Sequence, residues 1–252
     1  MKREELKEEF IEKLRNAEKL VFFTGAGISA ESGIATFRGQ NGIWNKMKPE
    51  ELANFDAFLR NPKLVWDWYK HRQEIISNTK PNAAHLAIAK LEEYYDVTVV
   101  TQNIDNLHRR AGSSKIFELH GNIERNYCIE CRTFYNSPEL EFRGGIPKCE
   151  RCGGLIRPDV VWFGEMLPQD QFTGGEQAAA LSDICFIVGT SAVVYPAAYI
   201  PFTARESGSY LVEINIEPTE ISSVVNYSIY EKAGTALPVI AEVAAEIKSS
   251  QT

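Results

Sequence analysis

Four of the five cysteines in this 252-residue chain are spaced for binding a metal ion. Cys128 and Cys131 form one Cys-x-x-Cys pair, Cys149 and Cys152 form a second, and 17 residues (132–148) separate the pairs. Each pair presents two thiolates from a short knuckle, and two knuckles complete the tetrahedral shell that Zn²⁺ adopts. Four sulfur ligands leave no open coordination position, so the spacing predicts a structural zinc ion.

Amide, carboxylate and imidazole side chains follow two of the apolar segments. Gln102, Asn103 and Asp105 come after one such segment, and His120 comes directly after another. Taken alone, the first three are as typical of a turn as of a ligand site. A histidine can serve as a general base near neutral pH, and a lone histidine is more often structural. The place of His120 at the end of a strand leaves the two roles evenly balanced.

A glycine-rich loop follows the first apolar run, residues 20–23. Gly25 and Gly27 allow the backbone to approach another group closely. The hydroxyls of Ser29 and Ser32 can reach a phosphate, and the N–H groups of such a loop favour anions. The loop therefore indicates a nucleotide site, with an ordinary tight turn as the alternative.

The loop departs from the usual dinucleotide fingerprint. Ala30 stands where the third glycine of that fingerprint falls, so the loop alone is a weak signal for a dinucleotide. Phe37 and Arg38 strengthen the signal, because they add a cationic second edge to the site.

Polar residues also follow two later apolar segments. Thr190, Ser191 and Asn215 can hydrogen-bond a second phosphate or a ribose. The acidic residue that normally holds the ribose, about 20 positions after the glycine loop, has no clear counterpart. Glu217 is the candidate to replace it from the other half of the sheet.

These residues need a scaffold that brings the ends of several strands together. Apolar runs predict buried strands at 20–23, 96–100, 115–119, 184–188 and 210–215, and Cys185 is expected to be a buried residue of one of them. Helices are expected at 2–17, 82–93, 169–181 and 237–249, with an aromatic-rich helical stretch at 41–78. This alternation predicts an α/β fold with a parallel sheet, whose carboxyl edge binds ligands.

The composition limits the possible classes of protein. Apolar and charged residues make up 44% and 24% of the chain, as in globular proteins generally. The net charge of −7 argues against a general nucleic-acid binder. No run approaches the roughly 18 apolar residues of a membrane span, and the charged start does not look like a signal peptide. We therefore expect a cytoplasmic protein with no membrane partner and no specific nucleic-acid partner.

In combination, these motifs resemble those of the sirtuins, which are NAD-dependent protein-lysine deacylases. The resemblance runs in order from about residue 20 to 240 and includes the loop 25–33, Phe37-Arg38, the segments 101–105 and 120–122, both cysteine pairs, the segment 189–191 and Asn215. One departure is Ala35, where the family usually has a proline. Loss of that φ restraint should leave the cofactor loop more mobile.

The resemblance implies a Rossmann-like parallel-sheet domain with a smaller domain made of a helical module and a zinc ribbon. The larger domain would comprise residues 1–34, 79–123 and 159–252. The helical module would comprise 35–78 and the zinc-ribbon module 124–158. NAD, the co-substrate, would lie in the cleft between the domains, and acyl-lysine would enter from the opposite side.

The resemblance also implies roles for individual residues. Asn103 and Asp105 would form the nicotinamide pocket with Ile104 between them, and His120 would be the general base. The cofactor-binding residues would be Gly25, Ala26, Gly27, Ser29, Phe37, Arg38, Gln102, Asn103, Ile104, Asp105, Gly189, Thr190, Ser191, Asn215, Glu217 and Ala233. The products would be nicotinamide, free lysine and 2′-O-acyl-ADP-ribose.

Two segments resemble the loops between which sirtuins clamp a substrate peptide, namely 160–165 and 193–197. A peptide added there as a strand would be held by its backbone with little sequence preference. Val161, Phe163 and Val194 would contact it, although plain buried segments are the alternative. Acyl-lysine proteins, including acylated chromatin-type proteins, would be the partners of a monomeric enzyme.

Tyr69 and Arg72 lie three residues apart and face the same side of a predicted helix. Spacing alone favours an ordinary surface arginine beside a half-buried tyrosine. The pair resembles the Tyr-x-x-Arg pattern of class III sirtuins, which remove succinyl, malonyl and glutaryl groups. Ala53 resembles the small residue of their acyl pocket. The resemblance thus implies a desuccinylase and demalonylase with weaker deacetylase activity.

Other functions remain open from the sequence. The alternatives are an enzyme that is mainly a deacetylase, a mono-ADP-ribosyltransferase, and a non-catalytic sensor of NAD or acyl-ADP-ribose. The presence of a general-base candidate argues against the sensor. A zinc-ribbon nucleic-acid module is disfavoured by the acidic chain.

Overall fold

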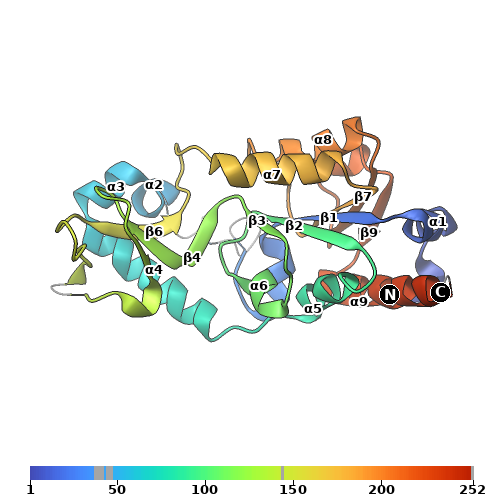
Figure 1. The fold of residues 1–252 in the computed structure, drawn as a ribbon, viewed down its shortest axis with the longest axis horizontal. Coiled ribbons are helices and arrows are strands. Elements are labelled where there is room, and N and C mark those ends of the chain that lie inside the picture. Colours follow the sequence, from blue (N-terminus) through green and yellow to red (C-terminus); the bar gives the residue numbers. More distant parts are fainter. Residues whose placement is uncertain (37–42, 44–47, 143–144, 251–252) are drawn as a thin grey trace.

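Six parallel strands form the central sheet of the computed structural model, which describes residues 1–36, 43, 48–142 and 145–250 (Figure 1). The strand order is β3-β2-β1-β7-β8-β9. Their bounds are β1 Lys19–Thr24, β2 Asp96–Thr101, β3 Ile116–Glu118, β7 Ile184–Val188, β8 Tyr210–Asn215 and β9 Tyr227–Tyr230. The chain leaves β1 in one direction toward β2 and returns on its other side as β7. The carboxyl ends of β1 and β7 therefore form the topological switch point, where open α/β sheets bind ligands.

Helices cover both faces of this sheet, and alternate strand residues pack against each layer. One layer contains α1 Glu8–Asn16, α5 Ala83–Leu91 and α9 Ala233–Ser249, and the other contains α7 Gln169–Ala180 and α8 Tyr199–Glu206 (Figure 1). Phe22 faces the first layer and stacks on Phe186 of the neighbouring strand, with ring centroids 4.6 Å apart. Phe23 faces the second layer. Burial on both faces explains why the strands are almost continuously apolar.

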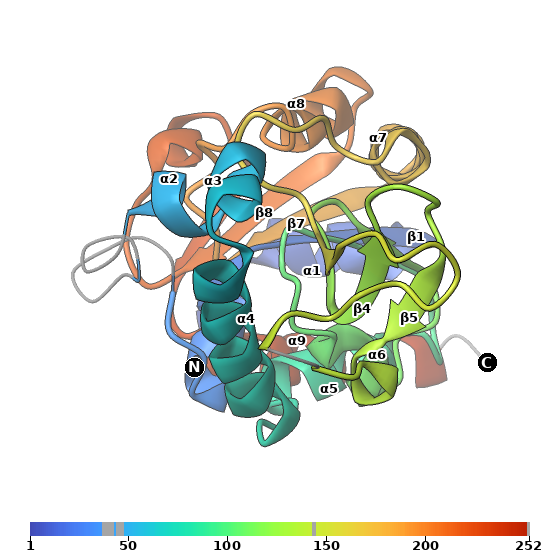
Figure 2. The same cartoon turned by 90° about the vertical axis from the view of Figure 1, so that its left-hand side faces the viewer.

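A smaller antiparallel sheet and a group of helices form a second hydrophobic core (Figure 2). The sheet order is β5-β4-β6, with β4 Gly121–Cys128, β5 Phe134–Asn136 and β6 Ile156–Val160. The helices are α2 Pro49–Leu52, α3 Phe55–Arg60 and α4 Pro62–Ser77. Trp66 of α4 is fully buried and donates from Nε1 to the carbonyl of Ile156 over 2.9 Å. We call the six-stranded sheet with its helices the sheet unit, and this second core with its elements the small unit.

Short helices complete the described part of the chain. They are the 3-10 helices η1 Arg3–Glu5, η2 Ala26–Ser32, η4 Ser137–Glu139 and η6 Glu220–Ser223, and the short helix α6 Leu107–Ala111. Within the described residues, every helix is too short or too polar to cross a membrane.

The parallel α/β fold predicted from the sequence is confirmed, with local differences. The sequence pattern does not predict β9 or α8, because β9 is a short edge strand with alternating polar residues and α8 contains Pro201 near its start. The last helix begins at Ala233 rather than at 237. The segment expected as one helix at 2–17 is split into η1 and α1.

Candidate active site and metal centre

The loops after β1 and β7 meet backbone to backbone at the switch point. The N–H of Gly27 donates to the carbonyl of Gly189 over 2.8 Å. A Cβ at Gly27 would lie 2.7 Å from the Gly189 Cα, and a Cβ at Gly25 would lie 2.6 Å from the Thr190 Cβ. Both distances are too short for any side chain. The glycines recognised in the sequence are therefore required for the two loops to approach each other.

Polar groups from the first two central strands converge beside this contact. The hydroxyl of Ser29 donates to Asp105 Oδ2 over 2.7 Å, and Asn103 Nδ2 donates to the carbonyl of Gly25 over 3.0 Å. The Leu107 N–H donates to Asp105 Oδ1 over 3.0 Å. Burial raises the pKa of Asp105, while hydrogen bonds from Leu107 and Ser29 act in the opposite direction. The structure thus brings Ser29, Asn103 and Asp105 into one buried cluster.

A small pocket opens over this cluster. It is lined by Ala26, Ser29, Ile34, Arg72, Ile76, Asn103, Ile104 and Asp105. Arg72 reaches it from α4 of the small unit, so the pocket lies between the two units. Burial lowers the pKa of the Arg72 guanidinium, and electrostatic interactions with Tyr69 and Asp105 oppose that shift. The pocket therefore combines an apolar wall with amide, hydroxyl, carboxylate and guanidinium groups.

His120 lies in the turn between β3 and β4, at the same edge of the sheet. Its Nδ1 is 2.9 Å from the carbonyl oxygen of Gln102. A carbonyl only accepts hydrogen bonds, so Nδ1 carries the proton and the Nε2 lone pair is available. Burial lowers the pKa of His120, although the hydrogen bond to Gln102 opposes this effect. A neutral imidazole with an available Nε2 is the form that a general base needs near pH 7.

The predicted residues of the later strands lie around the same edge. Gln102 Nε2 donates to Thr190 Oγ1 over 2.9 Å, and Asn215 Nδ2 donates to the Thr190 carbonyl over 3.2 Å. Ser191 and Glu217 are exposed, so their side chains are accessible to a ligand.

Ala233, at the start of α9, adjoins the glycine loop. The backbone N–H of Gly234 donates to Glu31 Oε2 of η2 over 2.7 Å. Ala233 itself is buried. Phe37 and Arg38, predicted as cofactor-binding residues, lie outside the described residues.

Two buried histidines form a pair behind the glycine loop that the sequence did not predict, although an inward-facing His85 is expected from its helix. His108 Nε2 lies 3.0 Å from the Thr24 hydroxyl, His85 Nε2 lies 3.5 Å from the Ser29 hydroxyl, and the two rings meet edge to face at 4.8 Å. Burial lowers the pKa of His85 to about 4 and that of His108 well below its ordinary value. No spacing pattern marks these residues, because they come together only through the packing of α5 and α6.

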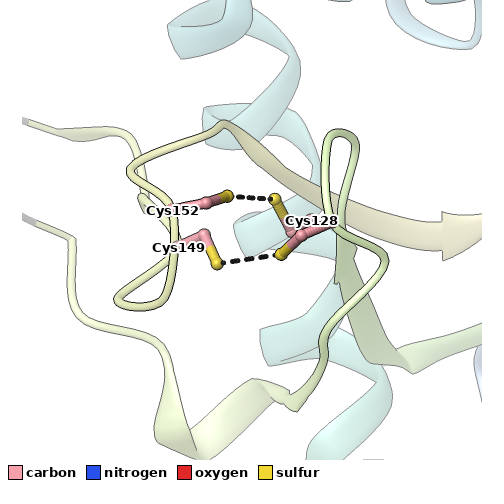
Figure 3. A group of neighbouring side chains, drawn as sticks. Cys128, Cys149 and Cys152 are labelled. Carbon is pink, nitrogen blue, oxygen red and sulfur yellow. Dashed lines mark hydrogen bonds between the residues drawn. The ribbon is translucent and has the colours of Figure 1, made fainter.

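The four predicted metal ligands form one cluster in the small unit. The sulfur atoms of Cys128, Cys131, Cys149 and Cys152 all lie within 4.8 Å of one another. Figure 3 labels Cys128, Cys149 and Cys152 of this cluster. The Cys128–Cys152 and Cys131–Cys149 sulfur pairs are each 3.5 Å apart. Four sulfurs at about 2.3 Å from a tetrahedral Zn²⁺ would be roughly 3.8 Å apart, so the cluster fits that ion.

Groups around the cluster also suit bound thiolates. Tyr135 Oη lies 3.1 Å from Cys149 Sγ, and Thr133 Oγ1 lies 3.1 Å from Cys131 Sγ. Hydroxyls that donate to ligating sulfurs stabilise their charge. The fifth cysteine, Cys185, is a buried residue of β7 as expected, and burial raises its pKa to about 12.

Tyr69 and Arg72 are both buried, with exposures of 1% and 6%. The alternative of a surface arginine beside a half-buried tyrosine is therefore wrong. The Tyr69 hydroxyl accepts a hydrogen bond from Trp162 Nε1 over 2.7 Å. Burial raises the pKa of Tyr69 well above its ordinary value, so the phenol stays protonated.

The two predicted peptide-binding segments differ in their contacts. In the segment 160–165, Val161 donates its N–H to the His120 carbonyl and Phe163 donates to the Ala53 carbonyl, each over 3.0 Å. The side chain of Phe163 is about half exposed. Val194, in the second segment, is half-buried. The first segment thus connects His120 directly with the helical part of the small unit.

A parallel sheet with a ligand crevice at its switch point, combined with a four-cysteine ribbon, defines a Rossmann-like protein with a zinc-binding module. The model of the Sir2 family matches residues 25–196. This chain belongs to the Sir2 family.

Relatives match this chain over nearly its whole length. "NAD-dependent protein deacylase 2" of Pyrobaculum aerophilum is 50% identical over 94% of this chain and 96% of its own. "NAD-dependent protein deacylase" of Pyrococcus furiosus is 49% identical over 91% and 94%. A solved Sir2 homolog–NAD complex has a TM-score of 0.89 at 40% identity and covers 98% of this chain and 96% of that chain. A Sir2–p53 peptide–NAD⁺ complex has a TM-score of 0.82 at 34% identity and covers 98% and 99%.

Proposed function

We propose that this protein is an NAD-dependent protein-lysine deacylase, and that succinyl and malonyl groups are its preferred acyl groups. The observation that carries the deacylase assignment is the neutral His120 imidazole, tied through Nδ1 to Gln102, at the edge where the pocket of Ser29, Asn103 and Asp105 opens. The relatives named as deacylases and the solved complexes with NAD and a peptide support it.

The residues of the crevice fit NAD. The contact between the loops of Gly27 and Gly189 presents backbone groups to a phosphate, and Ser29, Gln102 and Asn215 offer hydrogen-bonding groups to a ribose or phosphate. The Ser32 hydroxyl is buried without a hydrogen-bond partner among the described residues, which suits a ligand. When bound, NAD supplies a ribose carbon that becomes electrophilic as nicotinamide leaves.

Asn103 and Asp105 would hold the carboxamide end of the co-substrate, with Ile104 as the apolar wall between them. Their positions are set by short hydrogen bonds to backbone and to Ser29, so they need little reorganisation on binding. His120 Nε2 would accept a proton from a ribose hydroxyl, because it is the unprotonated nitrogen of a neutral ring. The four thiolates of the cysteine cluster would hold a structural Zn²⁺, which maintains the fold of the small unit.

The geometry around Tyr69 supports the acidic acyl preference. Trp162 Nε1–H donates to the Tyr69 oxygen, so the phenol proton remains to be donated to an acceptor. Arg72 brings a buried guanidinium to the pocket wall three residues along the same helix. A carboxylate on the acyl chain would offer charge-assisted hydrogen bonds to both groups. Ala53, buried and small, would leave room for the chain.

One observation favours a simple deacetylase instead. The Asp105 carboxylate is near enough to oppose the lowering of the Arg72 pKa by burial, so Arg72 can interact with a carboxylate of the site itself. An acetyl group would then meet a pocket wall whose charge is already balanced.

The test is a turnover assay on acetyl, succinyl and malonyl versions of one peptide, with NAD and with nicotinamide as inhibitor. For Arg72→Met we expect kcat/KM on the succinyl peptide to fall about two orders of magnitude, as one desolvated Arg–carboxylate interaction would give. Activity on the acetyl peptide should remain. Trp162→Phe, which keeps the ring but removes its N–H, should lower the succinyl rate more than the acetyl rate.

Three different outcomes would contradict three different parts of the proposal. An unchanged rate on the succinyl peptide for Arg72→Met would contradict the role of Arg72 in binding the acyl carboxylate. Modified protein carrying ADP-ribose in place of free lysine, seen by mass spectrometry, would point to ADP-ribosyl transfer. The absence of any NAD-dependent turnover would contradict the deacylase assignment itself.

A further inference from the structure

A hydrogen bond between two side chains, those of Glu118 and Asn122, spans the base of the turn that contains His120. Glu118 precedes the turn at the end of β3, and Asn122 follows it in β4. Asn122 Nδ2 donates to Glu118 Oε1 over 2.7 Å and to Asn106 Oδ1 over 3.1 Å. The Glu118 side chain is only 7% exposed, so its carboxylate depends on these partners.

Arg125 links this turn to the neighbouring strand β6. Its Nη1 donates to Glu118 Oε2 over 2.8 Å, and its Nε donates to Asp159 Oδ2 over 3.0 Å. Glu118 belongs to the parallel sheet and Asp159 to the antiparallel sheet. One guanidinium therefore bridges the sheet unit and the small unit through two carboxylates.

His120 is also linked directly to the residue that follows β6, by a backbone hydrogen bond close to the Arg125 bridge. Two residues after Asp159, the N–H of Val161 donates to the His120 carbonyl over 3.0 Å. Between these links, a Cβ at Gly121 would lie 2.1 Å from the Asp159 carbonyl oxygen, so the two strands are as close as a glycine allows. A change in the spacing of Glu118 and Asp159 must therefore move His120 relative to the segment 160–165.

A second arginine near Glu118 lacks this geometry. Arg109 of α6 places Nη2 3.9 Å from Glu118 Oε1, and its side chain is 51% exposed. Among the described residues, the structure gives Arg109 no ion pair with Asp159. Of these two arginines, only Arg125 contacts both carboxylates, through its forked guanidinium, and an ammonium would present a single point charge in its place.

We propose that Arg125 is a positioning residue, which sets the alignment of the His120 imidazole with the peptide-binding segment 160–165 through Glu118 and Asp159. The inference rests on the proposed function, in which His120 is the base, and on the predicted role of this segment in binding the acyl peptide. Misplacement of reacting groups by about 1 Å can lower a rate by about 100-fold. We expect the Arg125 bridge to matter for turnover more than for folding. Without it, the buried Glu118 carboxylate keeps its hydrogen bond from Asn122 and the nearby guanidinium of Arg109, and the Arg125 side chain itself is 42% exposed.

The experiment compares Arg125→Gln with Arg109→Gln, which serves as the matched control, in the full zinc-loaded chain. Steady-state kinetics on an acyl peptide should show a higher KM for peptide and a lower kcat for Arg125→Gln, with kcat/KM reduced about 10- to 100-fold. The NAD dissociation constant and the thermal midpoint should stay near the wild-type values. Arg109→Gln should remain within about twofold of wild type in every parameter.

Two further variants test the bridge itself. Glu118→Gln with Arg125→Gln should cost little more than the worse single change, because both break the same link. Arg125→Lys should recover only part of the activity. Equal losses for Arg125→Gln and Arg109→Gln, additive losses in the double variant, or a fall in NAD affinity and thermal midpoint that parallels the loss of activity would overturn the proposal.

A measurement that needs no turnover tests the positioning role of Arg125 separately from the proposed deacylase function. The NMR signal of the His120 Cε1–H should shift in Arg125→Gln and stay in place in Arg109→Gln. If the wild-type protein shows no NAD-dependent turnover, the proposed function fails, and this signal alone decides whether Arg125 positions His120. An unchanged signal in Arg125→Gln contradicts the positioning role whatever the activity.

Discussion

The sheet unit and the small unit accommodate buried charge in different ways. In the sheet unit the fully buried Glu213 accepts hydrogen bonds from the hydroxyls of Thr219, Ser222 and Ser228. In the small unit the buried Arg157 forms a two-point ion pair with Glu165, and its guanidinium carbon lies 3.4 Å from the Trp162 ring centroid.

The difference follows from what each unit has available for its core. The sheet unit encloses six mainly apolar strands between two helix layers, so hydrophobic burial dominates its stability. The small unit has a three-stranded sheet with helices packed beside it, and it adds a thiolate cluster and cation–aromatic contacts. We infer that the small unit depends on its metal and its ion pairs, whereas the sheet unit folds without them.

Removal of zinc should give the largest effect and separate the two units. Structural zinc contributes on the order of 10 kcal/mol in small zinc domains, so a strong chelator should unfold the small unit and abolish turnover. Of the four tryptophans, Trp66, Trp68 and Trp162 belong to its core, and Trp44 lies outside the described residues. The fluorescence of these three core tryptophans reports on this unit, while far-UV circular dichroism follows the whole chain. We expect fluorescence to change strongly while most helical signal remains.

The matched control for the metal site is Cys185→Ala, which changes the one cysteine outside the cluster. It should retain one zinc per chain, whereas Cys149→Ser should lose it. Simultaneous loss of both signals after chelation would show that the sheet unit depends on the metal as well.

His120→Ala should leave both units folded and stop the reaction between them. General-base groups contribute about 10²- to 10⁴-fold, and turnover should fall by that amount. NAD binding, measured by calorimetry, should remain close to wild type, because among the described residues Gln102 is the one predicted NAD residue that hydrogen-bonds the ring, and it does so through its backbone carbonyl. A variant with near wild-type rate would remove His120 from the mechanism.

Acid should weaken the sheet unit through its two buried histidines. The pKa of His85 is about 4 in the folded chain, and that of His108 is also lowered, whereas both are near 6.5 when unfolded. The unfolded chain therefore binds more protons below pH 6.5, and stability should rise with pH between about 4 and 6.5 and be complete above it.

The size of this acid effect is at most about 3 kcal/mol for His85, and urea unfolding at several pH values would measure it. His85→Gln should flatten the dependence. His71→Gln, at an exposed position of the small unit, should leave it unchanged. A slope of the opposite sign would mean that these histidines are charged in the folded protein.

Gly27→Ala should have the smallest effect and act only on the sheet unit. Its Cβ would push against Gly189 at 2.7 Å, so the loops after β1 and β7 would separate, and NAD affinity should fall about tenfold or more, as a clash of 1–3 kcal/mol would give. Zinc content and tryptophan fluorescence should not change. Ala30→Ser, at an exposed position of the same 3-10 helix, is the control. A fluorescence change in Gly27→Ala would show that this substitution also alters the small unit, which contradicts the prediction.

Much of the site could be predicted because its residues stand in recognisable local patterns. The cysteine pairs and the glycine loop each occupy a short stretch of sequence, and both kinds of backbone geometry recur in proteins. The Arg125 bridge could not be predicted, since Glu118, Arg125 and Asp159 lie on three different strands. The contact between His85 and His108 could not be predicted either, because these residues lie on two different helices, α5 and α6.

The sequence by itself determined the parallel α/β class, the metal-ligand set and the list of polar residues at the strand ends, because these follow from periodicity and spacing along the chain. Only the tertiary structure decided that Tyr69 and Arg72 are buried, which nitrogen of His120 carries the proton, and which carboxylates Arg125 joins. Burial and hydrogen-bond partners depend on segments far apart in the chain, and local sequence carries no record of them.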